Sequence, residues 1–246
     1  MKILFHFGRY AMFMKRVFGR PERHKVFFKQ IVTEMDLLGI SSIGIVVIIS
    51  FFIGAVTTLQ TAYNLVAPYI PISTVATVTR DSVLLEFSST MIALILAGKV
   101  GSHIASEIGT MRVTEQIDAL DVMGLNSAGF LLLPKVLGLM FMVPFLTIIS
   151  MFVGIFGGWA AGSITGTVPS AEYIQGIIYV FIPFYILYSI IKSVVFAFIV
   201  TSIAGYYGYH VTGGSLEVGR SSTTAVVMSC IFILIFDLIL TQLLLP

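Results

Sequence analysis

Two long stretches of this chain, residues 37–79 and 136–171, contain no Asp, Glu, Lys or Arg. A helix needs about 20 mostly apolar residues to cross the hydrocarbon core of a bilayer, so each stretch is long enough to contain a membrane span. The composition agrees, because 57% of the residues are hydrophobic, only 11% are charged, and the mean hydropathy is +1.02. Soluble domains have about 25% charged residues. We therefore expect an all-α, polytopic membrane protein.

The distribution of apolar residues predicts about five transmembrane helices. Pro68 and Pro71 favour an external connection over residues 59–79, and Pro144 predicts a kink in the third helix. The fourth apolar block is longer than one simple span, which favours a short outer helix before Pro183. The expected spans are residues 37–58, 83–105, 136–161, 177–207 and 225–245.

Basic residues are concentrated at the N-terminus, where eight of the 14 lysines and arginines lie within the first 30 residues. The positive-inside rule therefore places the N-terminus in the cytoplasm, and five spans then place the C-terminus on the other side. Aromatic residues alternate with these bases, so residues 1–36 are expected to form an interfacial amphipathic segment, broken near Gly19-Arg20-Pro21. An ordinary basic flank of the first span is the alternative. Residues 37–246 then form a single transmembrane domain.

A polar island, residues 99–126, separates the second span from the third. Connections between helices can be much shorter, so this island is expected to contact something in the aqueous phase. Thr114 is expected to cap a short helix that has Glu115 in its first turn, and Gly124 is expected to end that helix. Residues 106–112 form either a second short helix or an extension of the second span.

The expected helix of the island is amphipathic. Ile117, Leu120 and Met123 recur at helical spacing, while the acidic residues lie elsewhere around the helix axis. A cytoplasmic insert of this kind, covering about residues 106–127, is suited to dock into a groove of a soluble partner. The alternative is a helix that rests on lipid headgroups without a partner. Its acidic side chains disfavour this alternative, because the cytoplasmic leaflet is itself negative.

Three charged residues interrupt the expected spans: Glu86, Lys192 and Asp237. A charge at the centre of the bilayer costs about 2.5–3.5 kcal/mol, so three of them indicate mutual compensation or a polar cavity. Their positions along the spans allow all three to meet in the outer half of the bundle. Opposite charges about 4 Å apart attract by about 4 kcal/mol at an effective dielectric constant of about 20. A salt bridge that only holds helices together and a polar element of a cavity both remain open.

Motifs for covalent chemistry are missing from the sequence. It has no glycine-rich nucleotide loop, no serine nucleophile elbow and no HExxH motif. Cys230 is the only cysteine, and the four histidines lack metal-ligand spacing. We therefore expect a chain that is not an enzyme, binds no metal, cofactor or nucleic acid, and does not bind ATP by itself.

The segment EIGTMRVTEQIDALDVMG, residues 107–124, resembles the signature of the MlaE/YrbE permeases, the membrane subunits of ABC transporters that work with MCE proteins. Residues 97–101, 191–196 and 219–227 resemble further family segments, and the resemblance covers about residues 25–245. One departure is Leu85-Glu86-Phe87-Ser88-Ser89, where the family has Arg-Glu-Leu-Gly-Pro; it leaves open the local helix shape and the role of the missing arginine.

The resemblance implies a homodimeric permease in the inner (cytoplasmic) membrane of a double-membraned bacterium, with a periplasmic C-terminus. It moves phospholipids to or from a periplasmic MCE-domain hexamer and helps to maintain outer-membrane lipid asymmetry. A separate ABC ATPase dimer uses ATP and Mg, and a small cytoplasmic STAS-like subunit is a further candidate partner. The residues expected to line the lipid cavity are Glu86, Lys192 and Asp237. The expected ATPase-coupling residues are Glu107, Gly109, Met111, Arg112, Thr114, Glu115, Gln116, Asp118, Leu120, Met123 and Gly124.

Two other classes of function are alternatives for this sequence. A membrane scaffold would recruit a soluble cytoplasmic partner through the island without transport, and a sealed salt bridge with no cavity would favour it. An intramembrane enzyme would need a catalytic cluster at membrane depth. One Glu, one Lys and one Asp do not resemble a nucleophile with its base, which disfavours the enzyme.

Overall fold

The computed structural model describes residues 2–19, 24–65 and 71–245, and its regular secondary structure over these residues is entirely helical. Five helical stretches are long and apolar enough to cross a membrane, judged by length and composition. The prediction of an all-α polytopic protein is therefore confirmed. The five stretches are Val26–Asn64, Ser73–Val113, Ser127–Thr165, Phe184–Tyr209 and Ser215–Leu244.

The helices extend beyond the apolar runs that predicted them. The first stretch reaches Asn64 and the second begins at Ser73, so most of the segment expected as an external connection, residues 59–79, is helical. Uncharged polar residues such as Thr, Ser and Gln keep the backbone hydrogen bonds of a helix while lowering its hydropathy, so a hydropathy pattern ends too early. Residues 66–70, which include Pro68, lie outside the described residues.

Two of the stretches combine α-helix with wider, π-helical turns. In the first, α2 (His24–Glu34) leads through η1 (Met35–Gly39) and a short 3₁₀ segment, η2 (Ile40–Ser42), into α3 (Ile43–Asn64). In the second, the order is α4 (Ser73–Ser82), η3 (Val83–Met91), α5 (Ile92–Leu96), η4 (Ala97–Gly101) and α6 (Ser102–Val113). Single π-helical turns often mark functional sites, and η3 contains Glu86.

The chain forms two compact units, and α8 (Ser127–Thr165), α10 (Phe184–Tyr209) and the second stretch each contribute to both. The first unit contains residues 1–41, 93–142 and 194–246. The second contains residues 42–92 and 143–193.

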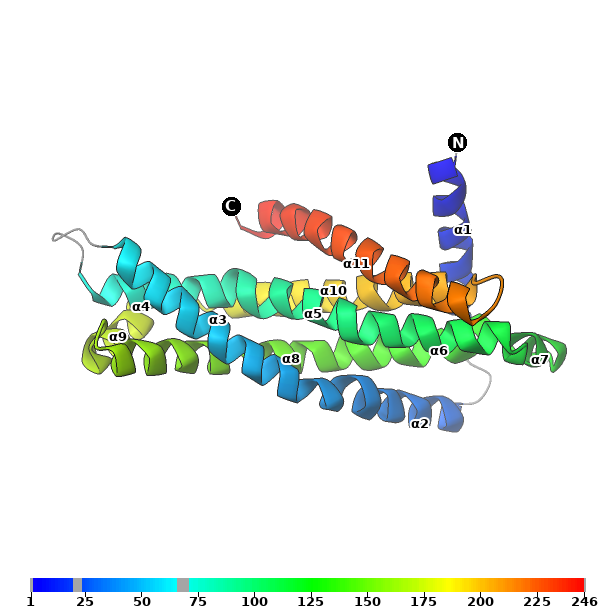
Figure 1. Ribbon diagram of the computed structural model, residues 1–246, viewed down its shortest axis with the longest axis horizontal. Coiled ribbons are helices and arrows are strands. Elements are labelled where there is room, and N and C mark those ends of the chain that lie inside the picture. Colours follow the sequence, from blue (N-terminus) through cyan, green and yellow to red (C-terminus); the bar gives the residue numbers. More distant parts are fainter. Residues whose placement is uncertain (1, 20–23, 66–70, 246) are drawn as a thin grey trace. The chain divides into compact units, whose positions relative to one another are not determined.

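In the first unit, α11 (Ser215–Leu244) lies along α6 (Figure 1). The apolar core of the first unit includes Phe196 and Ile233, both fully buried. The N-terminal helix α1 (Lys2–Val17) buries Phe13 and Val17 in the same unit. The expected interfacial segment therefore divides into α1 and α2, and α2 is continuous with the first long stretch. Arg20 and Pro21, at the expected break, lie outside the described residues.

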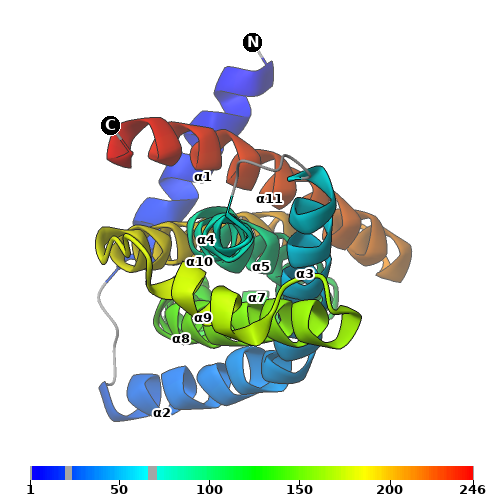
Figure 2. The same cartoon turned by 90° about the vertical axis from the view of Figure 1, so that its left-hand side faces the viewer.

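In the second unit, α4 packs along the short helix α9 (Ser170–Ile178), as Figures 1 and 2 both show. The short helix that the sequence predicted before Pro183 is therefore confirmed, whereas its location on the outer side stays a prediction. The buried guanidinium of Arg80, on α4, donates to the carbonyls of Ile177 and Tyr179 at 2.6 and 2.8 Å. These bonds satisfy carbonyls at the end of α9 that have no intrahelical partner.

Helices α3 and α8 cross at backbone contact in the second unit. A Cβ atom on Gly54 would lie 1.8 Å from the carbonyl oxygen of Gly154, and one on Gly157 would lie 2.2 Å from that of Phe51. Gly154 and Gly157 of α8 therefore serve close packing between two helices of the same chain. α8 is assigned as one unbroken helix through Pro144.

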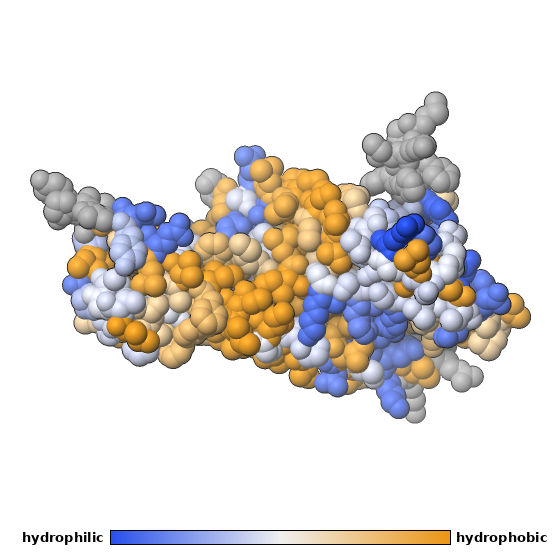
Figure 3. All heavy atoms as spheres, in the orientation of Figure 1, coloured by the Kyte–Doolittle hydropathy of each residue, from blue (hydrophilic) through white to orange (hydrophobic). Residues whose placement is uncertain are grey.

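The outer face of α3 is apolar and exposed. Ile48, Phe52 and Val56 are 60%, 61% and 58% exposed and recur every four residues, on one side of the helix. Figure 3 shows hydrophobic side chains gathered over α3, and hydrophilic ones near the end of α6 and the beginning of α11. An exposed apolar face on a long apolar helix is the surface that a lipid-facing span requires.

Replacing Gly54 by alanine should destabilise the protein, because the added methyl group collides with a backbone carbonyl that cannot move aside. We expect a loss of about 3 kcal/mol or more, at the upper end of the cost of overpacking. The matched control is Gly98→Ala, where the Cβ meets nothing within 4 Å, so the change should be within about 1 kcal/mol. Thermal unfolding of the purified protein in detergent measures both, and equal melting temperatures would contradict the close crossing.

Candidate functional site

The polar island forms a corner at the end of α6. Residues 106–112 belong to α6, so they extend the second stretch, one of the two expected alternatives. The second helix, α7 (Gln116–Val122), begins after Glu115, whose φ of 59° lies in the left-handed region. The expected cap was wrong: the Thr114 hydroxyl donates to the carbonyl of Thr110 at 2.8 Å, in α6. The sharp reversal needs a left-handed residue at 115, which makes Thr114 the end of α6 rather than the start of α7.

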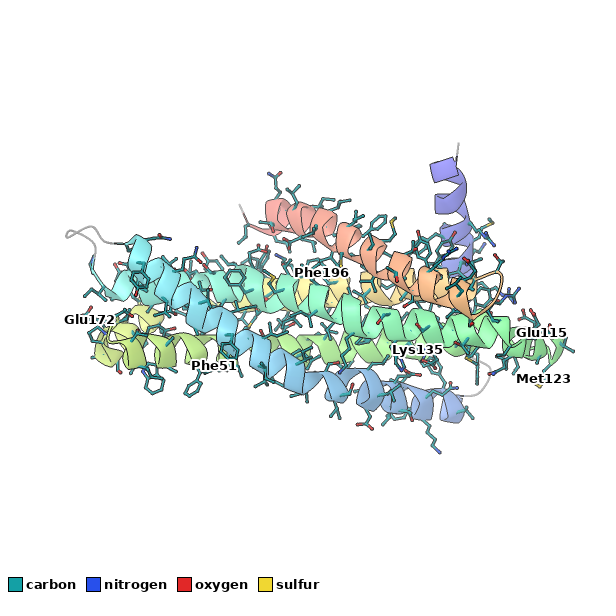
Figure 4. The ribbon with its side chains drawn as sticks, viewed as in Figure 1. Phe51, Glu115, Met123, Lys135, Glu172 and Phe196 are labelled. Atoms are coloured by element: carbon teal, nitrogen blue, oxygen red, sulfur yellow. The ribbon has the colours of Figure 1, made fainter. Side chains whose placement is uncertain are left out.

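The end of α7 agrees with the sequence. Gly124 follows the helix with φ of +79°, a conformation that glycine adopts without strain. Ile117 is fully buried, Leu120 is partly buried, and Met123 is 65% exposed. The expected apolar face is therefore divided, because Ile117 anchors α7 to the unit while Met123 and Val122, which is 88% exposed, point outward. Figure 4 shows Glu115 and Met123 at this corner.

The acidic side chains of α7 are paired with bases of the same unit. Asp118 accepts from Arg112 at 2.5 Å, and Asp121 accepts from Arg16 at 2.8 Å. These carboxylates hold α7 in place. The groups that stay exposed at the corner include Glu115, at its turn, and the apolar side chains of Val122 and Met123.

Helix α1 braces the corner from the N-terminal side. The carbonyl of Arg16 accepts from the Asn126 side chain at 2.7 Å, and Tyr10 donates to Ser202 at 2.8 Å. The Phe13 ring packs against His210, with ring centres 5.3 Å apart. Burial lowers the pKa of His210 below its usual value, the hydrogen bond to the Tyr206 backbone opposes this, and the nearby Arg9 and Arg112 add to the lowering, so the neutral ring is favoured beside α1.

The remaining residues of the island have defined positions. Gly109 lies against Val218 of α11, where a Cβ would come within 3.1 Å of the valine side chain. Gln116 donates to the Thr114 hydroxyl at 3.0 Å, and Met111 is partly buried. These contacts fix the shape of the corner.

A charged cluster lies behind the corner, in the same unit. The ammonium of Lys135, on α8, donates to Glu34 of α2 at 2.7 Å and to Glu107 of α6 at 2.8 Å (Figure 4). The Lys135 side chain is only 3% exposed, and those of Glu34 and Glu107 are 17% and 37% exposed. The sequence did not single out Lys135, because it directly precedes an uncharged block and resembles an ordinary flanking charge.

The second charged site lies in the second unit. Lys192, fully buried on α10, donates to both carboxylate oxygens of Glu86 at 3.1 Å. It also donates to the Tyr188 hydroxyl at 3.1 Å and to the Leu85 carbonyl at 3.4 Å. Glu86 is 40% exposed and accepts from Thr90 at 3.1 Å. Two of the three predicted cavity residues therefore meet, and the accessible member of the pair is the carboxylate.

Two serines follow Glu86 and Phe87, where the family has Gly-Pro. Ser88, in the π-helical η3, and Ser189, on the facing helix α10, share a hydrogen bond of 3.1 Å. The Ser89 hydroxyl is buried and has no hydrogen-bond partner among the described residues. The local helix shape that the sequence left open is thus a π-helix.

Asp237 lies on α11, in the first unit, with a partly exposed side chain. Its meeting with Glu86 and Lys192 stays a prediction. The sequence analysis also missed Arg80, which is 2% exposed, because it directly follows the first uncharged block. Over the described residues, no group of three or more His, Cys, Asp or Glu side chains is placed to hold a metal ion.

The two members of the Glu86–Lys192 pair should respond differently to neutralisation. Glu86→Gln removes a carboxylate from a fully buried ammonium, which should cost about 3 kcal/mol. Lys192→Met leaves a carboxylate that is 40% exposed instead of fully buried, so a smaller loss than for Glu86→Gln is expected. Thermal unfolding in detergent measures the difference, and a larger loss for Lys192→Met would contradict the observed burial.

Comparison with known proteins agrees with this architecture. A family model described as permease MlaE matches residues 31–243. A probable ABC transporter permease protein of Rickettsia bellii is 34% identical over 236 residues, which cover 96% of this chain and 91% of the relative. One from Synechocystis sp. is 35% identical over 210 residues, 85% of this chain and 80% of the relative. The chloroplastic protein TRIGALACTOSYLDIACYLGLYCEROL 1 of Arabidopsis thaliana is 30% identical over 218 residues, 89% of this chain and 62% of the relative. The chain therefore belongs to the MlaE permease family of membrane proteins.

Proposed function

We propose that this chain is the permease subunit of an ABC transporter that moves phospholipids between the inner membrane and a periplasmic MCE-domain hexamer, and so helps to maintain outer-membrane lipid asymmetry. The observation that carries the proposal is the Glu86–Lys192 pair, a partly exposed charged site within helices suited to span a membrane. The family membership and the names of the relatives support the transporter class. The name of the Arabidopsis relative contains a glycerolipid, which supports a lipid substrate.

The charged pair presents its negative group to an entering headgroup. Lys192 is enclosed by Glu86, Tyr188 and the Leu85 carbonyl, so an entering molecule meets the Glu86 carboxylate first. A charge in an apolar span is costly and is retained mostly for function. We assign the Glu86–Lys192 pair to the lipid-handling cavity, and a part for Asp237 of α11 in the same cavity stays a prediction of the sequence.

The corner at the end of α6 is the proposed docking site for the ATPase. Val122 and Met123 project from a helix whose acidic side is already neutralised by Arg112 and Arg16. An exposed apolar tip on a rigid helix suits insertion into a hydrophobic groove. In the proposed complex, two copies of this chain dock on an ATPase dimer, which binds ATP and Mg. A STAS-like subunit is a further proposed component.

The contact between α1 and α7 supports the proposed orientation. Arg16 belongs to the basic N-terminal region, and Asp121 belongs to the corner, so their salt bridge supports a proposed location of both on the same side of the membrane. The positive-inside rule makes that side the cytoplasm. The inner membrane of a double-membraned bacterium and a periplasmic C-terminus complete the proposal.

Purification of the intact complex tests the proposal against the scaffold alternative. The full chain, isolated from its own membranes in mild detergent, should retain an ATPase and phospholipid identifiable by mass spectrometry. Reconstitution should then show ATP-dependent transfer of that phospholipid to the MCE protein. Recovery of the chain without an ATPase would overturn the proposed transporter. Recovery of the chain with a soluble partner that is not an ATPase would favour the scaffold.

Charging the exposed tip of α7 should release the ATPase. Val122→Asp and Met123→Asp each place a carboxylate in the proposed groove, so ATPase recovered with the chain should fall at least about tenfold, equivalent to about 1.4 kcal/mol of binding. Neither change should alter folding, because both side chains are exposed. The matched control is Ile164→Asp, an 85% exposed aliphatic residue near the end of α8, which should retain the ATPase. Full retention by both corner variants would exclude this docking site.

A further inference from the structure

Lys135 joins three helices of the first unit through one ammonium group. Glu34 is the last residue of α2, Glu107 lies in the middle of α6, and Lys135 lies near the start of α8. α6 carries the corner proposed to meet the ATPase, whereas α2 and α8 belong to the first and third long stretches. The cluster therefore connects the corner to two other candidate spans.

The charges of this cluster do not balance. Two carboxylates share one ammonium, and the second oxygen of Glu34, Oε2, is buried without a hydrogen-bond partner among the described residues. His103 approaches Glu107, with 3.6 Å between Nδ1 and Oε2, and adds positive charge only when protonated. Apolar side chains of similar volume often stabilise a buried site as well as an ion pair does. Stability alone thus gives a weak reason for placing Lys135 here.

Geometry gives a better reason. Packed apolar side chains can slide past one another, whereas charge-assisted hydrogen bonds hold their donors and acceptors at fixed short distances. The two bonds of Lys135, at 2.7 and 2.8 Å, hold α6 in one register against α2 and α8. A displacement of α6 must then move its neighbours or break a bond inside the protein.

We propose that Lys135 is a positioning residue that transmits displacement of the α6–α7 corner to α2 and α8 through Glu107 and Glu34. This inference rests on the proposed function, because it assumes that an ATPase moves the corner. Loss of the Glu107 bond leaves a balanced Lys135–Glu34 pair, so it should disconnect α6 without unfolding the unit.

Glu107→Gln tests the inference in the complex of the full chain with its ATPase. Hydrogen–deuterium exchange is compared before and after trapping the ATPase with ATP and vanadate. In the wild type, exchange should change in α6, α7 and α2; in Glu107→Gln, it should change in α6 and α7 but not in α2. Lipid transferred per ATP hydrolysed should fall at least tenfold, while Lys135→Arg should retain at least half of the wild-type ratio. If exchange in α2 of Glu107→Gln changes on trapping as much as it does in the wild type, the inference is overturned.

A neutral triple variant separates transmission from stability. Lys135→Met alone leaves two facing carboxylates and can prevent folding, whereas combining it with Glu34→Gln and Glu107→Gln removes all three charges. The triple variant should melt near the wild-type temperature and bind the ATPase, yet transfer at least tenfold less lipid per ATP. Wild-type transfer by a stable triple variant would show a purely structural role and overturn the inference.

Exposed charges of the same region provide matched controls. Lys29→Met, on α2, and Asp36→Asn, on η1, remove a lysine and a carboxylate that are exposed to solvent, and both should retain wild-type coupling. The wild type separates this inference from the proposed function. If the wild type transfers no lipid, the lipid part of the proposed function fails, whereas the exchange response of α2 still decides the role of Lys135.

Discussion

A buried cation needs acceptors from its surroundings, and this requirement organises both units of the protein. Arg80, Lys135 and Lys192 are each at most 3% exposed. Arg80 holds the end of α9 through backbone carbonyls, Lys192 holds η3 through Glu86, and Lys135 holds α2 and α6 through two carboxylates. Each cation connects parts of the chain that are distant in sequence, because removing a charge from water is tolerable only where such partners converge.

The corner shows how a charged segment becomes a contact surface. Its carboxylates form salt bridges with Arg112 and Arg16, so they fix α7 instead of facing the partner. The residues left exposed at the tip are apolar, and Glu115 sits in the left-handed turn that sets the direction of α7. The sequence predicted an amphipathic helix whose acidic residues lie apart from its apolar ones, and in the structure Asp118 and Asp121 pair with arginines of the same unit while Val122 and Met123 stay exposed.

Mechanical work and lipid handling would then use different charged sites. The corner and the Lys135 cluster belong to the first unit, and the Glu86–Lys192 pair belongs to the second. Helices α8 and α10 and the first and second long stretches each contribute residues to both units, so the chain passes between the two units within helices. Glu86 lies in the π-helical η3, a helix type that is often found at functional sites, and its side chain is 40% exposed.

The sequence by itself determined the class of protein, the number of spans, the place of the corner and its end at Gly124. These follow from local quantities: hydropathy over about 20 residues, helical spacing, and the conformations that glycine allows. It also predicted that Glu86, Lys192 and Asp237 can meet, because an isolated charge in an apolar span needs compensation, and the first two are in contact. Only the tertiary structure decided which charges are buried. Lys135 and Arg80 lie at the ends of uncharged blocks and look like solvated flanks in the sequence, and they become buried because α2 and α6 pack over the first and α9 ends against the second. Burial and pairing depend on which distant segments meet, and no local pattern contains that information.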